Sequence, residues 1–399
     1  MTQDFSLRTI DATQMRQVNR SAILELVRQS NPIARSEICK LLGLSMPTVI
    51  RIVDELIDDG LVELTGETAG NTGRPRQLLR YNHNGGMVIG IDLGGTSLYG
   101  ALANIGGEVL GELFTSQGGL SAEENYSLVV QMIQSLVEMS IQQKQTLLGV
   151  AIGVPGVTLA GSGVVEWAPS LNWRKFALKD RIAECFQLPV VVDNDVNLAV
   201  LGELWFGVGR GVRNLVLLSI GTGVGAGIVI DGMLYRGHNS ASGEVGYFIP
   251  GIEALGQRYE QFGAMEEIIS DIGLVKRARP LLSSVQPEMD LGSLTAGDII
   301  SSARRDEPWA IRLMDETADY LGMVVANIAT LLDPDLIILG GGISSSADLL
   351  IPRIHFRIEG VIQHVPRLEA SSLGARATVM GAISTVLHLT KDYYVVRRL

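Results

Sequence analysis

Hydrophobic and polar positions predict three helices at the start of the chain. Residues 18–42 show the apolar spacing of two helices, and Gly43 ends the second one in a tight turn. Ser45 is a preferred N-cap and Pro47 suits a first turn, so a third helix is expected over residues 46–59. Two helices joined by such a turn are typical of a helix-turn-helix. The apolar face expected for the third helix comprises Val49, Ile50, Val53, Leu56 and Ile57.

Two alternating segments after the third helix, residues 61–65 and 76–81, predict a hairpin wing. A recognition helix contacts bases with its N-terminal residues, and basic wing residues bind phosphates or enter a minor groove. An alternative is that the helices serve protein contacts and the wing arginines are merely solvated. The capped helix, turn glycine and basic wing occur together and in order, which favours DNA. The residues expected to contact DNA are Arg35, Ser45, Met46, Pro47, Thr48, Arg51, Arg74 and Arg76.

Charge separates this head from the rest of the chain. The formal net charge is −11, and all of it lies after residue 85, because residues 1–85 hold ten basic and ten acidic side chains. Nucleic acid repels an acidic body, whereas a neutral head can present a basic face. The chain shows neither a membrane-spanning apolar run nor a signal peptide pattern, so a cytoplasmic protein without a membrane partner is expected. Cys39 and Cys185 predict neither a disulfide framework nor a multi-cysteine metal site.

A strand, glycine loop, strand pattern begins at residue 87 and recurs over residues 214–234. Two similar units predict a duplicated α/β fold with two lobes around a cleft. In the first loop, DLGGTS, Gly94 and Gly95 let the backbone approach an anion, and Asp92 can hold Mg²⁺ through water. A third loop, LGGGIS, follows a strand near residue 339 and can cover an adenosine. Each glycine loop alone is weak evidence for nucleotide binding, since glycines are common at strand ends. Three such loops in this order favour a nucleotide-binding fold.

The segment VVVDNDVN lies between the two units and brings polar side chains to the end of a strand. Asn194 can hydrogen-bond sugar hydroxyls, and Asp195 can act as general base when a hydroxyl attacks a γ-phosphate. The alternative is that Asp193 or Asn194 merely caps the next helix, which leaves Asp195 unexplained.

These motifs resemble the ROK family (repressors, open reading frames, kinases), specifically its winged-helix, sugar-responsive repressors. The resemblance runs from VNRSAILELV through GLSMPTV, GRPR, DLGGTS, VPGV, SLNW, DNDVN, GTGVGAG and SGEVG to LGGGIS. It implies an α/β chain in which a winged helix-turn-helix precedes a two-lobed, actin-like sugar kinase fold, assembled as dimers or dimers of dimers. The domains expected are the head, 1–82, a first lobe, 83–198 with 379–399, and a second lobe, 199–378.

The resemblance also implies which residues form the ligand site. The sugar side comprises Asn172, Asn194, Asp195, Glu244, Tyr247 and Glu266. The nucleotide side comprises Asp92, Gly94, Gly95, Thr96, Gly221, Thr222, Gly223, Gly341 and Gly342.

The chain departs from the family pattern in the loop after Glu244. Members usually carry a histidine and three cysteines that bind structural Zn²⁺, whereas this sequence has Tyr247, Gln257, Tyr259 and Ala264 at those positions. Zinc needs thiolate or imidazole ligands, so no metal site is expected. The loop is expected to be held instead by packing of Phe248, Ile249, Leu255 and Phe262. Without the histidine, the effector can differ from glucose or N-acetylglucosamine. Ser97 also stands where family members often have lysine, which removes a charge contact to phosphate.

Two functions follow from these features. In the first, a sugar binds between the lobes and changes how the head binds operator DNA, with no cofactor required. In the second, the body is an ATP-dependent, hexokinase-like sugar kinase that uses Mg-ATP and has Asp195 as its catalytic base, alone or combined with DNA binding. The head has no use in a pure kinase, so the first function is favoured.

Overall fold

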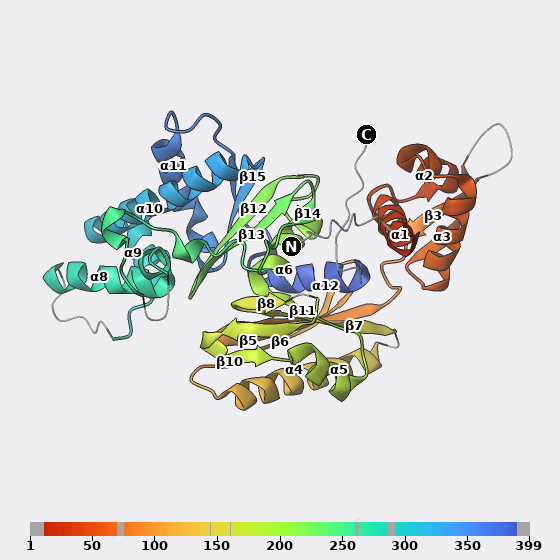
Figure 1. The fold of residues 1–399 in the computed structure, drawn as a ribbon, viewed down its shortest axis with the longest axis horizontal. Coiled ribbons are helices and arrows are strands. Elements are labelled where there is room, and N and C mark those ends of the chain that lie inside the picture. Colours follow the sequence, from red (N-terminus) through yellow and green to blue (C-terminus); the bar gives the residue numbers. More distant parts are fainter. Residues whose placement is uncertain are drawn as a thin grey trace, which may run out of the picture.

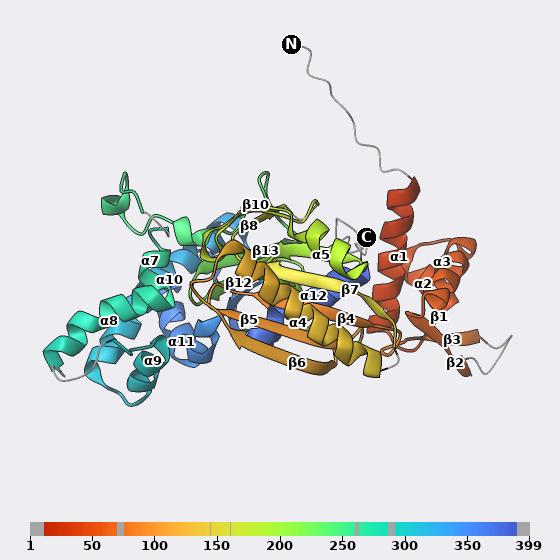
Figure 2. The same cartoon turned by 90° about the horizontal axis from the view of Figure 1, so that it is seen from below.

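The computed structural model describes residues 12–69, 76–143, 145–159, 161–259, 263–285 and 292–388. A small head lies at one end of the molecule, and two larger lobes lie beside it (Figures 1 and 2). Within the described residues, no helix is long and apolar enough to cross a membrane.

The head is a winged helix-turn-helix, as the sequence predicts. Gly43 ends the second helix in the left-handed conformation (φ 66°), and the Ser45 hydroxyl accepts the Thr48 amide at the start of the third. The wing strands pair antiparallel, and a two-residue strand from the first turn completes a sheet of order β1-β3-β2. The elements are α1 (Ala12–Gln29), β1 (Ile33–Ala34), α2 (Arg35–Leu42), α3 (Met46–Asp58), β2 (Val62–Ala69) and β3 (Arg76–Tyr81).

The apolar face predicted for α3 is wrong at two positions, because it includes Ile50 and omits Ile52. The helix buries Val49, Ile52, Val53 and Leu56, whereas Ile50 is 42% exposed. Buried positions spaced three and four residues apart form one helical face, and residue 50 is turned about 100° away from residue 49. Ile50 therefore belongs to the solvent face of the recognition helix.

The first lobe is built on a five-stranded sheet of order β11-β7-β4-β5-β6. Side chains alternate across its central strand: Ile89 and Ile91 face one hydrophobic core with α4 and α5, whereas Val88 faces the core on the other side. A small antiparallel sheet, β10-β9-β8, lies at its edge. The elements are β4 (Met87–Leu93), β5 (Ser97–Asn104), β6 (Val109–Ser116), α4 (Ala122–Gln142), β7 (Leu147–Val154), β8 (Val157–Leu159), β9 (Val164–Ala168), β10 (Trp173–Phe176), α5 (Leu178–Phe186) and β11 (Val190–Asn194).

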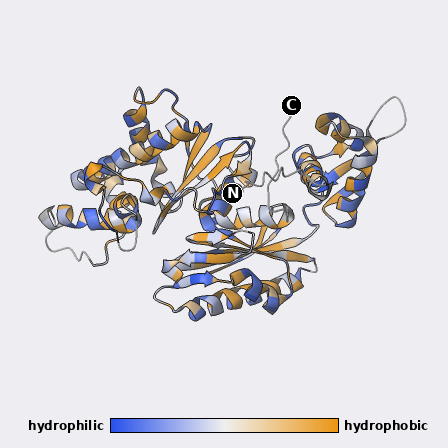
Figure 3. Cartoon of the chain, viewed as in Figure 1, coloured by the Kyte–Doolittle hydropathy of each residue, from blue (hydrophilic) through white to orange (hydrophobic). Residues whose placement is uncertain are grey.

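The second lobe repeats this plan. Its sheet has the order β14-β13-β12-β15-β16. In both sheets the first three strands pair antiparallel, a fourth strand pairs parallel with the first of them, and a fifth pairs parallel with the fourth. The duplication predicted from the sequence is confirmed. The central strands are hydrophobic along their length (Figure 3). The elements are β12 (Leu215–Ile220), β13 (Val224–Ile230), β14 (Met233–Leu234), α7 (Glu266–Ile269), α8 (Asp271–Val285), α9 (Ala296–Arg304), α10 (Pro308–Leu332), β15 (Leu336–Gly340), α11 (Ala347–Ile358) and β16 (Arg367–Ala370).

Two helices, α6 (Asp195–Phe206) and α12 (Ala377–His388), lie between the two sheets (Figure 1). They cross closely: a Cβ atom added to Gly381 would lie 1.8 Å from the Leu198 carbonyl oxygen, and one on Gly202 2.1 Å from that of Ala377. The body is thus a stack of five layers, with helices outside each sheet and these two in the middle. Short 3-10 helices cover the connections: η1 (Pro169–Leu171), η2 (Val245–Tyr247), η3 (Ile252–Ala254), η4 (Gly342–Ser346) and η5 (Gly374–Arg376).

Candidate functional site

Three neighbouring strands of the first lobe bring two acidic residues to one edge of the sheet. In the parallel register, Asp92 on β4 and Asp193 on β11 both lie opposite Gly153 on β7. The chain then turns from Asp193 through Asn194 into α6, whose first residue is Asp195. The carboxyl ends of parallel strands are where α/β folds place ligands.

Gly153 allows these groups to meet. A Cβ atom there would lie 2.5 Å from the Thr378 methyl carbon and 3.2 Å from the Asp195 Cα. Thr378, on α12, shares a side-chain hydrogen bond with Asp92, and its hydroxyl donates to the Asp195 carbonyl at 3.5 Å. A larger residue in place of Gly153 would push α6 and α12 away from the strand edge.

Asn194 is the N-cap of α6. Its side-chain oxygen accepts the Asn197 amide at 3.0 Å, and its side-chain nitrogen donates to Gly156 and to Asp195, each at 3.0 Å. The capping alternative considered for this residue is therefore what the structure shows. Asn194 fixes the Asp195 carboxylate, whose Oδ1 also accepts the Val196 amide at 2.8 Å.

Four acids, Asp92, Asp195, Glu244 and Glu266, form an acidic cluster where the two lobes meet. Burial, and after it the Asp195 charge, raises the pKa of Asp92 to about 7, although the Thr378 hydrogen bond acts against this. Burial raises the pKa of Asp195 to about 6, although hydrogen bonds to its carboxylate act against this. Burial, then Asp195, raises the pKa of Glu244. Among the described residues, no lysine or arginine forms an ion pair with any of the four.

Glu266 belongs to the second lobe and connects the cluster with its glycine loops. Its pKa is raised to about 7, mainly by burial; the hydrogen bond from the Val224 amide lowers the pKa, and the Glu244 charge contributes to the rise. Its Oε2 atom lies 2.6 Å from the place a Gly246 side chain would occupy, so a larger residue there would displace the Glu266 carboxylate. Tyr247 is 51% exposed, and burial, Glu244 and Glu266 raise the pKa of its hydroxyl. Tyr247 therefore lies at the border of the cluster.

The two glycine loops of the second lobe meet directly. A Cβ atom on Gly221 would lie 3.6 Å from the Gly342 amide nitrogen, and the Gly221 carbonyl accepts the Asp271 amide at 2.8 Å. The Asp271 carboxylate faces both glycines, and burial raises its pKa. Thr222 and Gly223 complete the turn between β12 and β13, and Gly341 leads from β15 into η4.

The glycine loop of the first lobe is a tight turn between β4 and β5. The Gly94 amide donates to the Ser97 carbonyl at 2.8 Å, and the Thr96 carbonyl accepts the Gln117 amide at 2.9 Å. Gly95 approaches Ser170 and Thr96 is exposed. The acidic cluster links this loop, through Asp92, to those of the second lobe.

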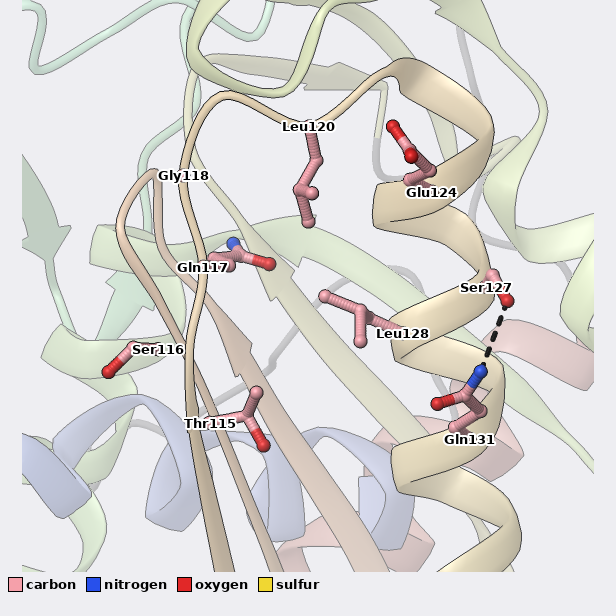
Figure 4. Close-up of a pocket in the computed structure, with 9 residues that line it drawn as sticks. All are labelled: Thr115, Ser116, Gln117, Gly118, Leu120, Glu124, Ser127, Leu128 and Gln131. Atoms are coloured by element: carbon pink, nitrogen blue, oxygen red, sulfur yellow. Dashed lines mark hydrogen bonds between the residues drawn. The ribbon is translucent and has the colours of Figure 1, made fainter.

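A hollow of about 640 Å³ lies behind this loop, between β6 and the start of α4 (Figure 4). Gln117 lines it and donates its side-chain amide to the Gly94 carbonyl. Leu120 also lines it, and the Leu120 carbonyl accepts the Asn172 amide at 2.9 Å. The exposed Asn172 thus lies beside the hollow, whereas none of the residues predicted for the site lines it.

Three participants were missed in the sequence. Thr378 and Asp271 lie far from the motifs in the chain, and only folding brings them to the acids. Arg236, from the second lobe, donates to Asp193 of the first lobe at 2.5 Å, and the Asp193 side chain is 2% exposed. This buried ion pair joins the lobes next to Asp195. In the sequence, the only indication of this ion pair was that the DND motif holds a second aspartate, Asp193, beside Asp195.

The loop after Glu244 holds no zinc-binding set. The described part of the chain contains no group of three or more His, Cys, Asp or Glu side chains that could hold a metal. Ala264, at one family cysteine position, is buried and has no donor atom, so the residues present do not fit Zn²⁺. The packing predicted for the loop is wrong at Ile249 and Leu255, which are 50% and 62% exposed. Phe248 does pack against the core, and Phe262 lies outside the described residues.

The start of α3 presents the predicted DNA-contact face. Met46, Pro47 and Arg51 are exposed, and Arg51 forms no ion pair with a described residue. Ser45 and Thr48 hydrogen-bond each other at 2.8 Å as part of the cap. A helix N-terminus with an unpaired arginine suits both phosphate and base contacts.

The other arginines predicted for DNA differ in their state. Arg35 is held by Asp54 at 2.8 Å, so it is neutralised within the head. Arg76 is the first residue of β3, and its side chain is not described. Arg74 lies outside the described residues.

Comparison with known proteins identifies both parts of the chain. The ROK family model matches residues 88–388, and a winged helix-turn-helix DNA-binding model matches residues 18–63. The xylose repressor of Caldicellulosiruptor bescii is 31% identical over 385 residues, 94% of this chain and 96% of the relative. A glucokinase of Halalkalibacterium halodurans is 33% identical over 311 residues, 73% of this chain and 92% of the relative.

A solved structure extends the similarity to the whole architecture. A crystal structure of a ROK family transcriptional regulator, a homolog of the E. coli MLC protein, superposes with a TM-score of 0.82 at 28% identity. The match covers 94% of this chain and 96% of that one, head included. The chain therefore belongs to the ROK family, among its sugar-responsive transcriptional repressors with an N-terminal winged helix-turn-helix.

Proposed function

We propose that this repressor binds a neutral sugar through the acidic cluster, that the sugar lowers its affinity for operator DNA, and that it is not a kinase. The observation that carries this proposal is the cluster itself: within the described parts of the chain, Asp92, Asp195, Glu244 and Glu266 have no cationic partner. Each carboxylate accepts hydrogen bonds, and a sugar supplies hydroxyl donors without negative charge. A phosphate group would instead meet like charges.

D-xylose is the first candidate effector. The relatives that align with the head as well as the body include a xylose repressor. Tyr247 supports a ligand other than glucose, because its bulky side chain borders Glu244 and Glu266 where the family pattern has histidine. A pentose lacks the exocyclic hydroxymethyl group of a hexose and needs less room there.

A kinase activity is the second candidate, favoured by the intact loop at Asp92 and by Asp195. The carboxylate oxygens of Asp92 are the ligand type that Mg²⁺ prefers, so Asp92 would hold a magnesium ion through water. Bound Mg²⁺ would neutralise phosphate charge, and Asp195 would take a proton from the sugar hydroxyl. Against this, Ser97 supplies no cation, and the Asp271 carboxylate faces Gly221 and Gly342 of the nucleotide side.

Thermal shift separates the two functions. The full-length chain is heated with D-xylose, D-glucose or N-acetyl-D-glucosamine, each with and without Mg-ATP, and ADP release is measured in parallel. A ligand at 100 times its Kd adds about 2.7 kcal/mol to the free energy of unfolding. Stabilisation by a sugar without ADP release supports the sensor. ADP released in proportion to added sugar would establish the kinase instead.

The remaining parts of the proposal concern assembly and metal. A homodimer or dimer of dimers would place two heads on the two half-sites of a palindromic operator, and a protein bound to operator DNA acts in the cytoplasm. No zinc is required, because Tyr247, Gln257, Tyr259 and Ala264 supply neither thiolate nor imidazole. Metal analysis of the purified protein tests this, and stoichiometric zinc would contradict it.

A further inference from the structure

Helix α6 connects the acidic cluster with the DNA head. Its first residue is Asp195, and its last two residues, Trp205 and Phe206, contact Arg28 on α1 of the head. At 1.5 Å per residue, the 12 residues span about 18 Å. One regular element therefore reaches from the proposed sugar site to the head.

This helix has little freedom to bend. Eight of its residues are buried, among them Asn197, Val200 and Trp205, so neighbours surround it on every side. Gly202 brings its backbone against the α12 backbone. A displacement at one end of so tightly packed a helix is transmitted to the other end, because packed interiors do not deform continuously.

The far end of α6 is tied to the second lobe. Glu203 is fully buried, and its carboxylate accepts hydrogen bonds from the hydroxyls of Ser371 at 2.6 Å and Ser372 at 3.0 Å. It also accepts the Leu373 amide at 3.0 Å. These three residues follow β16 of the second sheet. The C-terminal end of α6 is therefore hydrogen-bonded to the second lobe, and Leu201 and Trp205 also belong to the buried cluster of Val88 and Ile105 of the first lobe.

Beside the buried cluster that they share, the head and the body are joined by two polar contacts among the described residues, one to each lobe. The Tyr81 hydroxyl donates to the Ile105 carbonyl of the first lobe at 2.9 Å, in a buried bond. The Arg28 guanidinium donates to the Trp205 carbonyl at 3.3 Å and lies 5.1 Å from the Trp205 ring and 5.5 Å from the Phe206 ring. Glu25 neutralises Arg28 at 2.8 Å, which keeps it oriented. A change in the angle between the lobes would turn the head about Tyr81.

We propose that α6 carries the sugar signal to the DNA head, and that Arg28 is the positioning residue through which it acts. This inference rests on the proposed function and adds the structural path by which sugar binding reaches the head. Sugar drawn onto Asp195 and Glu266 closes the lobes on each other, α6 shifts with the second lobe, and Arg28 pulls α1 with it. The spacing of the two heads in a dimer then no longer matches the operator.

Arg28→Met tests the route and has a matched control. Methionine keeps the apolar stem and removes the guanidinium. Arg20→Met is the control, because Arg20 also lies on α1 and pairs with an acid at 2.6 Å, but that acid is Asp59 within the head. Sugar binding is measured by thermal shift of the full-length chain with D-xylose, D-glucose and N-acetyl-D-glucosamine. Operator affinity is measured on DNA selected from a random pool by the wild-type protein.

In the wild type and in R20M, saturating sugar should weaken operator binding about 10-fold or more. In R28M, sugar affinity and sugar-free operator affinity should stay within about 3-fold of wild type, while the sugar effect on the operator falls below about 3-fold. An undiminished sugar effect in R28M would overturn the route and leave the proposed function intact. If no sugar stabilises the wild type, the proposed function fails, and the route falls with it.

A distance measurement covers the case in which R28M no longer binds operator. The two cysteines provide natural label positions, Cys39 in the head and Cys185 in the first lobe. Spin labels on both should show a sugar-dependent change of distance in the wild type and in R20M, and none in R28M. A change of equal size in R28M would contradict the proposal without any reference to DNA.

Discussion

At the scale of single residues, the acidic cluster is an arrangement of carboxyl groups whose pKa values are raised by burial. Asp92 illustrates how the ionisation of a buried carboxyl group lowers the free energy of unfolding. Its pKa is raised from 3.8 to about 7, chiefly by burial, so the folded state binds a proton that the unfolded state has released between these values. The stability contributed by this residue therefore falls as pH rises from about 4 to 7.

Asp92→Asn should remove this loss of stability at high pH, because asparagine carries no ionisable proton. We expect little change in the free energy of unfolding at pH 4 and a gain of roughly 1–3 kcal/mol at pH 8, measured by denaturant titration at both values. Glu123→Gln is the control, because Arg181 lowers the pKa of Glu123, so its loss should not stabilise the protein at high pH. A gain in D92N that is independent of pH would show that the carboxyl is not titrating.

A second residue-scale prediction concerns Asp54, which forms an ion pair with Arg35, a residue predicted to contact DNA. Asp54→Asn frees the arginine and removes a negative charge from the recognition helix. We expect DNA affinity to rise about 3- to 10-fold at 0.1 M salt, with a log–log salt slope steeper by about 1. Asp58→Asn, at the far end of α3, should change affinity less. Equal effects of the two substitutions in a filter-binding titration would show that only net charge matters.

The sequence predicted site residues inside local motifs, such as Asp92 and Asp195, because strand ends and glycine loops are local patterns, and the structure brings these two together. It did not reveal Thr378 or Arg236, whose partners are more than 40 residues away. Nor did it settle Asn194, since capping and sugar binding both suit asparagine in that position, and only the hydrogen bonds show the cap.

At the scale of elements, the contact between α6 and α12 fixes the geometry of the site. Gly381→Ala would place a methyl group 1.8 Å from the Leu198 carbonyl oxygen, so the helices must separate. We expect a loss of roughly 2–4 kcal/mol in unfolding free energy together with weaker sugar binding.

Gly322→Ala is the matched control for this substitution. Gly322 is also inside a helix, but a Cβ atom there would meet only Arg357 and Ile358 side chains at 3.5 Å and beyond. It should gain about 0.5–1 kcal/mol from helix propensity. The same gain in G381A, measured by urea unfolding, would mean that the two helices are not as closely packed as the structure has them.

The elements of the fold were predictable to different degrees. The helix-turn-helix has caps and a turn glycine in sequence, and the repeated strand and loop units indicated the duplicated sheet. Helix α6 was not placed between the lobes, because a helix buried on all sides lacks the one-sided apolar pattern that predicts a partner surface. Ile249 and Leu255 were predicted to pack but are exposed, since the apolar character of a loop residue does not by itself show whether it is buried.

At the scale of the whole molecule, the head and body share one hydrophobic core. Ile23, Val53 and Leu79 of the head belong to the same buried cluster as Leu201 of α6 and Ile383 of α12. Domains joined only by a linker melt separately, whereas domains that share a core unfold together.

We therefore expect a sugar bound in the body to stabilise the head as well. In calorimetry, D-xylose should raise the midpoint temperature of a single unfolding transition. Hydrogen exchange should slow in α1 and α3, although neither helix touches the sugar. L-xylose, its mirror image, has the same composition and should do neither. If D-xylose raised only a body transition and left a separate head transition in place, the shared core would not couple the two parts, and the sugar signal would have to reach the DNA through the arrangement of the dimer alone.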